Sequence, residues 1–194
     1  MAHFPSLPEQ ATLEHLFRRF PKGARPLMEL HDALLRQDDS VFSIAERELI
    51  AAYVSALNTC EYCFGAHRTM AIAFGIEPDL IDALVSDFDT APVSERLKAT
   101  LAYVRKVVHR DSVLPEDIRK MEAAGLNESG MQDALMIASL YSLMNRLVDG
   151  AGLARKQTYE QPNQADPGTR QGRTYVQWGL EAGFLHEDAA SRQS

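Results

Sequence analysis

The residues of this chain whose types and spacing could carry chemistry are two cysteines and a histidine. Cys60 and Cys63 are the only cysteines, they stand three residues apart, and His67 follows the second by four. On a helix these spacings place all three side chains on one face. A disulfide needs Cβ atoms about 3.8 Å apart, whereas such helical neighbours are about 5–6 Å apart. We therefore interpret the pair as a dithiol redox centre in the first turn of a helix that begins at 58–60, where the backbone can still adjust.

The helix start also bears on which thiol reacts. Asn58 and Thr59 favour N-cap positions, and the N–H groups and dipole of a helix N-terminus lower the pKa of a thiol. The dipole contributes only about 0.3–1 kcal/mol, less than one pKa unit, so efficient thiolate chemistry needs a nearby base. His67 lies one turn from Cys63 and two turns from Cys60. The spacing favours Cys63 as the activated thiol and Cys60 as its partner.

An acidic residue, Glu48, stands twelve residues before Cys60, in a segment with helical apolar periodicity over 43–57. Ser43-x-x-Glu46 forms a capping box that would start this helix. Glu48 heads a face of small residues, which would allow a neighbouring helix to approach the carboxylate. Spacing alone nevertheless favours a solvated surface acid, because acidic side chains are rarely buried.

Together these residues resemble the signature of the AhpD-like (alkylhydroperoxidase D) family, within the carboxymuconolactone decarboxylase superfamily. The matching pattern is an acid twelve residues before C-x-x-C-x-x-x-H, with V-S-A-L-N at 54–58 between them. The segments R-E-L at 47–49 and C-E-Y-C at 60–63 more closely resemble the branch of this family called peroxidase-related proteins. The resemblance is strong over 41–87 and extends weakly to about 150. It implies an all-α, multi-helix fold with the C-x-x-C at a helix N-terminus.

The resemblance also implies roles for the four residues. Cys63 resembles the peroxidatic thiol, Cys60 the resolving thiol that closes a Cys60–Cys63 disulfide, and His67 with Glu48 the proton relay. The implied enzyme is an alkylhydroperoxidase-like peroxidase of antioxidant defence, which reduces hydrogen peroxide or organic hydroperoxides. A partner dithiol protein would supply electrons, and no cofactor or metal would be needed. Some members carry a second histidine between the cysteines, where this chain has Glu61-Tyr62.

Composition narrows the class of protein. The 194 residues are 45% hydrophobic, enough for a proper core, and the net charge is −7 with no basic cluster, which argues against nucleic acid as a partner. No apolar run reaches transmembrane length and the first residues do not read as a signal peptide, so we expect no membrane partner. A C-x-x-C pair indicates a redox or metal role in a reducing compartment, hence a cytoplasmic location.

Periodicity and capping signals predict helices throughout and no strands. We expect one helical domain over 1–156, followed by a polar linker at 157–172 and an apolar segment near 173–185 that docks on its own domain or on a neighbouring subunit. The helix at 130–149, opened by a capping box Ser129-x-x-Gln132, is apolar on most sides. Together with the apolar C-terminal segment it favours a homo-oligomer, and the resemblance implies a dimer, trimer or hexamer. His31, on a helix at 25–37, is interpreted as a surface or packing residue. The other predicted helices span 9–19, 59–74, 77–86, 95–109 and 115–124, with Gly75 and Gly125 as stop signals.

Four other interpretations stay open. The dithiol could serve as a general disulfide oxidoreductase. Cys60, Cys63, His67 and Glu48 could instead bind zinc in a non-enzymatic site, although structural zinc sites usually draw on two separated ligand pairs and no second pair exists. Decarboxylase or lactone chemistry is disfavoured, because the superfamily members named for it typically lack the cysteine pair. Buried, inert structural thiols are the remaining possibility.

Overall fold

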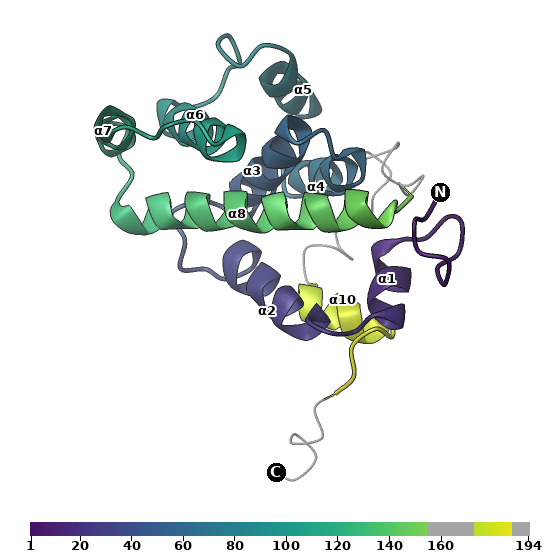
Figure 1. Cartoon of the computed structure of the whole chain (residues 1–194). Helices are drawn as coiled ribbons and strands as arrows, with labels where there is room; N and C mark the ends of the chain where they lie inside the picture. Colours follow the sequence, from purple (N-terminus) through teal and green to yellow (C-terminus); the bar gives the residue numbers. More distant parts are fainter. Residues whose placement is uncertain (155–172, 188–194) are drawn as a thin grey trace, which may run out of the picture.

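The computed structural model describes residues 1–154 and 173–187, and within these ranges every regular element is a helix (Figure 1). The all-α prediction is confirmed. The predicted linker at 157–172, and with it the boundary between domain and tail, lies outside the described residues. The helices are α1 (Leu13–Arg19), α2 (Ala24–Leu35), α3 (Ile44–Leu57), α4 (Glu61–Ala73), α5 (Pro78–Ser86), α6 (Glu95–His109), α7 (Pro115–Ala123), α8 (Glu128–Ala151) and α10 (Tyr175–Glu181).

The core is built around α3. This helix packs against α4, α6 and α8, and every residue of it from 47 to 55 is buried. A helix that is covered on all sides must be apolar or must pair its polar groups. In Figure 1 the long helix α8 crosses the molecule, with α3 to α7 on one side and α1, α2 and α10 on the other. The polar side chains of α3 are therefore enclosed between these layers.

Most helix ends follow the local signals. The capping box of α3 is present, since the Ser43 side chain accepts from the Glu46 amide and the Glu46 carboxylate accepts from the Ser43 amide. Gly75 and Gly125 end their helices with positive φ angles of 104° and 90°, a conformation that costs glycine little. Two predicted starts were wrong: α1 begins at Leu13, after the N-cap Thr12, and α8 begins at Glu128.

The start of α8 differs because another residue takes the N-cap. The Asn127 side chain accepts a hydrogen bond from the Gly130 amide at 2.9 Å, so Ser129 already lies inside the first turn. Asparagine and serine are both good N-cap residues, and the sequence did not rank them. The correction lengthens the helix to Glu128–Ala151 without changing which of its faces is buried.

The C-terminal helix α10 packs against α2 of the same chain (Figure 1). The Asp32 carboxylate on α2 accepts hydrogen bonds from the first two amides of α10, Tyr175 N–H at 2.5 Å and Val176 N–H at 3.0 Å. Arg18 donates to the Ala182 carbonyl at 2.6 Å at the other end. These contacts hold the two ends of α10 against the N-terminal helices and fix its position over the site described next.

No helix in the described part of the chain combines the length and the apolar character that a membrane crossing would need.

Candidate active site

The dithiol lies where α3 turns into α4. Cys60 is the N-cap of α4 and Cys63 lies in its first turn, so the dithiol is at the helix N-terminus as predicted, although the helix begins at Glu61, one residue after the predicted start at 58–60. The predicted N-cap residues were wrong. Asn58 is the C-cap of α3, and Thr59 adopts a left-handed φ of 57°, which is unusual for a β-branched residue. The chain reverses within three residues, and this tight connection overrides the capping preference of both side chains.

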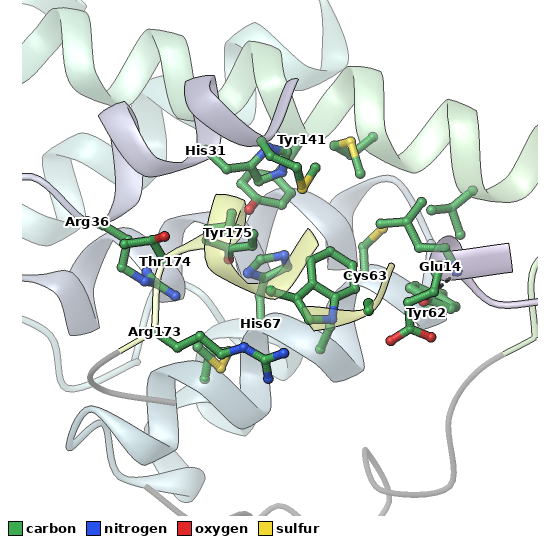
Figure 2. A pocket seen from close by; sticks show the side chains of 18 of the residues that line it. Glu14, His31, Arg36, Tyr62, Cys63, His67, Tyr141, Arg173, Thr174 and Tyr175 are labelled. Carbon is green, nitrogen blue, oxygen red and sulfur yellow. Dashed lines mark hydrogen bonds between the residues drawn. The ribbon is translucent and has the colours of Figure 1, made fainter. Parts of the chain in front are cut away.

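Both thiols are free and buried, with exposed fractions of 1% for Cys60 and 4% for Cys63. Only Cys63 lines a cavity of about 400 Å³, together with His67 from the next turn of α4 (Figure 2). The apolar part of the cavity wall includes Leu13, Met28, Met70, Met144, Val148 and Trp178. A small molecule in this cavity therefore meets Cys63, while Cys60 is its covered neighbour.

The resting Cys63 thiol is protonated. A hydrogen bond with Cys60 and burial raise the pKa of Cys63 far above its usual range, and a hydrogen bond with Asn145 opposes them only in part. The net shift of this pKa is upward, because the second thiol and the loss of water outweigh the lowering expected from the helix N-terminus. Reaction at Cys63 thus depends on a group that accepts its proton.

Asn145 belongs to a buried polar cluster behind the dithiol. Its amide N–H₂ donates to the Ser55 hydroxyl at 3.1 Å, and its carbonyl oxygen accepts from the Asn58 side chain at 2.9 Å. The Ser55 hydroxyl in turn donates to the Ala51 carbonyl at 2.8 Å. These bonds tie α8 to the end of α3 and hold the turn that carries Cys60.

Glu48 is fully buried, with an exposed fraction of 0%. Its Oε2 lies 2.6 Å from His67 Nδ1, and its Oε1 lies 2.6 Å from Arg36 Nη1. Burial by itself would raise the pKa of Glu48, but the charge of Arg36 and the hydrogen bonds from His67 and Arg36 lower it to about 2. The interpretation as a solvated surface acid was wrong, because the small residues around Glu48 let the neighbouring helices close over it.

The carboxylate decides the tautomer of His67. An ionised carboxylate only accepts hydrogen bonds, so His67 Nδ1 carries the proton and donates it to Glu48. The other ring nitrogen, Nε2, is then the basic one. His67 is 8% exposed and lines the cavity beside Cys63. A buried carboxylate that orients an imidazole beside a nucleophile is the arrangement of a general base and its positioning group.

Three residues that the sequence did not single out complete this arrangement. Arg36 follows α2, its side chain is 7% exposed, and its guanidinium lies 4.8 Å from the centroid of the Tyr175 ring. The Tyr175 hydroxyl, from α10, donates to Glu48 Oε1 at 3.4 Å. Tyr141, from α8, meets the His67 ring edge-on with centroids 4.3 Å apart. No local spacing links these residues to Glu48 or His67, so no motif could have found them.

His31 is a packing residue, as one of the two interpretations had it. It is 2% exposed, its Nδ1 lies 2.7 Å from the Leu27 carbonyl, and its ring packs against Tyr141 and Tyr175. Burial lowers its pKa to about 4. His31 is therefore neutral at physiological pH and donates from Nδ1 to the carbonyl.

The arrangement does not resemble a zinc site. Residues 1–154 and 173–187 contain no group of three or more histidine, cysteine, aspartate or glutamate side chains placed to hold a metal ion. Both oxygens of Glu48 are already occupied by Arg36 and His67.

Comparison with known proteins agrees with this fold. The model of the carboxymuconolactone decarboxylase family matches residues 21–106. No curated protein matches the chain in sequence. Among solved structures, an AhpD-core, uncharacterized peroxidase-related protein from Ralstonia eutropha JMP134 is 25% identical, with a TM-score of 0.69, over 75% of this chain and 76% of that one.

Two further structures are similar in fold. An uncharacterized peroxidase-related protein from Silicibacter sp. TM1040 is 21% identical over 76% of this chain and 78% of its own, with a TM-score of 0.68. A protein of unknown function from Agrobacterium tumefaciens, provisionally assigned to AhpD antioxidant defence, is 15% identical over 73% of this chain and 95% of its own, with a TM-score of 0.66. The matching family model and the folds of these three structures support the resemblance of the chain to the AhpD-like family within the carboxymuconolactone decarboxylase superfamily.

Proposed function

We propose that this protein is a thiol-dependent peroxidase that reduces hydrogen peroxide or organic hydroperoxides through a Cys60–Cys63 dithiol/disulfide cycle. The observation that carries the proposal is the cavity in which Cys63 and His67 meet, with His67 oriented by the buried Glu48. The names of two similar structures as peroxidase-related proteins, and of a third as an AhpD antioxidant defence protein, point the same way.

The proposed chemistry begins at Cys63. His67 Nε2 takes the thiol proton, and the thiolate attacks one oxygen of the hydroperoxide. The O–O bond breaks, Cys63 becomes a sulfenic acid, and the proton held by His67 passes to the leaving oxygen to give an alcohol or water. Cys60 then attacks the sulfenic sulfur, which forms the disulfide and releases water. A dithiol partner protein reduces the disulfide and closes the cycle.

Arg36 and Tyr175 keep Glu48 available for this cycle. With a pKa of about 2, Glu48 stays ionised when His67 is protonated, so it stabilises the imidazolium instead of taking its proton. The cycle uses only the protein's own side chains, a hydroperoxide as oxidant and a dithiol protein as reductant, with no haem, flavin or metal.

The proposal includes self-association of the chain. Leu135 and Leu143 on α8 are 39% and 52% exposed, whereas the other large apolar side chains of this helix are buried or half-buried. We expect a homo-oligomer in size-exclusion chromatography with light scattering. A stable monomer of 21.6 kDa would contradict this part of the proposal.

Single-turnover thiol oxidation tests the proposed function. Reduced, metal-free protein is mixed with one equivalent of cumene hydroperoxide, and free thiols and intact mass are followed for wild type, Cys63→Ser and Cys60→Ser. We expect wild type to lose both thiols as an intramolecular disulfide, Cys60→Ser to stop at the sulfenic acid, and Cys63→Ser to be inert. If wild type reacts no faster than a free thiol, the site does not act on peroxide.

A further inference from the structure

Tyr141 is a buried tyrosine whose hydroxyl has no hydrogen-bond partner among the described residues. The residue lies on α8, is 1% exposed, and is among the largest fully buried side chains of the chain. A buried hydroxyl without a partner destabilises a protein, and a phenylalanine of nearly the same shape would avoid that cost. The hydroxyl at this position therefore calls for a role other than packing.

The position of Tyr141 suggests that role. It lines the same cavity as Cys63 and His67, and Figure 2 shows it close to His67 and Tyr175. Its ring meets the His67 ring at 4.3 Å between centroids. Burial, with the nearby Tyr175 and Glu48, raises the pKa of Tyr141 well above its usual value. The hydroxyl thus keeps its proton and acts as a donor.

Four other polar side chains near the dithiol already have hydrogen-bond partners. Arg36 and His67 bind Glu48, the Tyr175 hydroxyl donates to the same carboxylate, and His31 is bonded to the Leu27 carbonyl. The Tyr175 hydroxyl lies near enough to Tyr141 to help raise the pKa of that residue, and its own proton is donated to Glu48.

Two arginine Nε atoms are also unpaired within the described residues, in Arg36 and Arg173. Arg36 is bonded to Glu48 through another of its nitrogens. Arg173 is 30% exposed and pairs with Glu181. Neither side chain is both fully buried and uncommitted, as Tyr141 is.

We propose that the Tyr141 hydroxyl is a catalytic group, which donates a hydrogen bond to the oxygen that leaves when Cys63 attacks a hydroperoxide. This inference rests on the peroxidase function proposed above. As the S–O bond forms and the O–O bond breaks, the sulfur is oxidised, the peroxide is reduced, and negative charge develops on the leaving oxygen. A hydrogen-bond donor that is already in place near this oxygen stabilises that charge. The proton that ends on the oxygen is the thiol proton delivered by His67, and Tyr141 retains its own.

The proposal predicts different effects on two reactions of the same thiol. Iodoacetamide alkylation needs the Cys63 thiolate but produces no alkoxide, whereas peroxide oxidation needs both the thiolate and a donor for the leaving oxygen. In Tyr141→Phe we expect the rate of oxidation by cumene hydroperoxide to fall by about tenfold or more, while alkylation stays within about twofold of wild type. The thermal unfolding midpoint should be unchanged or higher, since an unpaired hydroxyl is removed.

Tyr103→Phe is the matched control, because Tyr103 is an 8%-exposed tyrosine on α6 that does not line the cavity. Both of its rates should equal those of wild type. A second variant, with 3-fluorotyrosine at position 141, makes the phenol a stronger donor and should raise the peroxide rate alone. This variant keeps the side chain in place, so it tests the proposal even if Tyr141→Phe does not fold.

The outcomes separate the two proposals. If wild type reacts rapidly with peroxide and both position-141 variants match it, the role of Tyr141 is refuted while the peroxidase function stands. If peroxide and alkylation rates fall together, Tyr141 acts on the thiol or on His67, and the proposed role is likewise overturned. If wild type itself reacts no faster than a free thiol, the peroxidase function fails, and the assignment of Tyr141 fails with it.

Discussion

Replacing Glu48 by glutamine tests whether a buried charge organises the site. Glutamine keeps the volume of the side chain but has one carbonyl oxygen where glutamate has two charged acceptors. Its amide N–H₂ must then face either Arg36 or His67, both of which are donors at 2.6 Å in the native protein. The variant therefore leaves a buried guanidinium without a counterion, and one donor unsatisfied.

The size of the effect follows from the pKa of Glu48. The native environment lowers it from an ordinary 4.5 to about 2, a difference that corresponds to about 3 kcal/mol of stability at neutral pH. Breaking a buried ion pair from one side typically costs about 3–5 kcal/mol. We expect Glu48→Gln to lower the free energy of unfolding by about 3 kcal/mol or somewhat more at pH 7. A domain of about 5–15 kcal/mol total stability should still fold.

The pH dependence has a definite sign. Because the folded-state pKa is depressed, the stabilisation is fully present above about pH 4.5 and is lost as the pH falls toward 2. The difference in unfolding free energy between wild type and Glu48→Gln should thus be largest at pH 7 and 5, and shrink at pH 4 and 3. Urea unfolding of the reduced proteins, followed by circular dichroism at these pH values, measures it.

Glu46→Gln is the control, because Glu46 lies on the same helix but acts at its surface. It pairs with Arg96 at 2.6 Å and completes the capping box, so its loss should cost about 1 kcal/mol. If Glu48→Gln costs no more than Glu46→Gln, or if its cost is the same at pH 7 and pH 3, Glu48 is not held as a buried anion. The geometry of the relay would then have to be reconsidered.

Two further perturbations address His31 and α10. Burial lowers the pKa of His31 from 6.5 to about 4, so the folded state binds fewer protons than the unfolded state, and the free energy of unfolding should fall as the pH drops from 6.5 to 4. In His31→Gln this loss of stability should be smaller. If the urea midpoint shifts equally between pH 7 and pH 5 in wild type and His31→Gln, the expectation is contradicted. Asp32→Ala removes the side chain that accepts hydrogen bonds from two α10 amides, and the loss should weaken the docking of α10 by about 1 kcal/mol. If α10 covers Cys63, alkylation of this thiol should then be about fivefold faster. Asp82→Ala, which removes an exposed ion pair with Arg68, is the control and should not change the alkylation rate. No change in the alkylation rate of Asp32→Ala would show that α10 does not cover the thiol.

The sequence by itself determined what depends on near neighbours along the chain. The all-α class, the ends of most helices and the place of the dithiol in the first turn of α4 follow from periodicity, capping and glycine signals that act over three or four residues. The starts of α1 and α8 were missed where another capping residue competed nearby. The four residues Cys60, Cys63, His67 and Glu48 were singled out because they share one short motif.

Only the tertiary structure decided the electrostatics of the site. Glu48 is an anion because Arg36, at the end of α2, and His67, from α4, offset the cost of its burial. Tyr175, from the distant α10, also donates a hydrogen bond to it. The pKa of the Cys63 thiol is raised by burial and by Cys60, contrary to the helix-dipole argument. Burial depends on which helices pack together, and for polar groups it sets both the cost of a charge and the partner that must offset it. A sequence motif gives the spacing of its own residues, but it does not predict which other helices will pack over them.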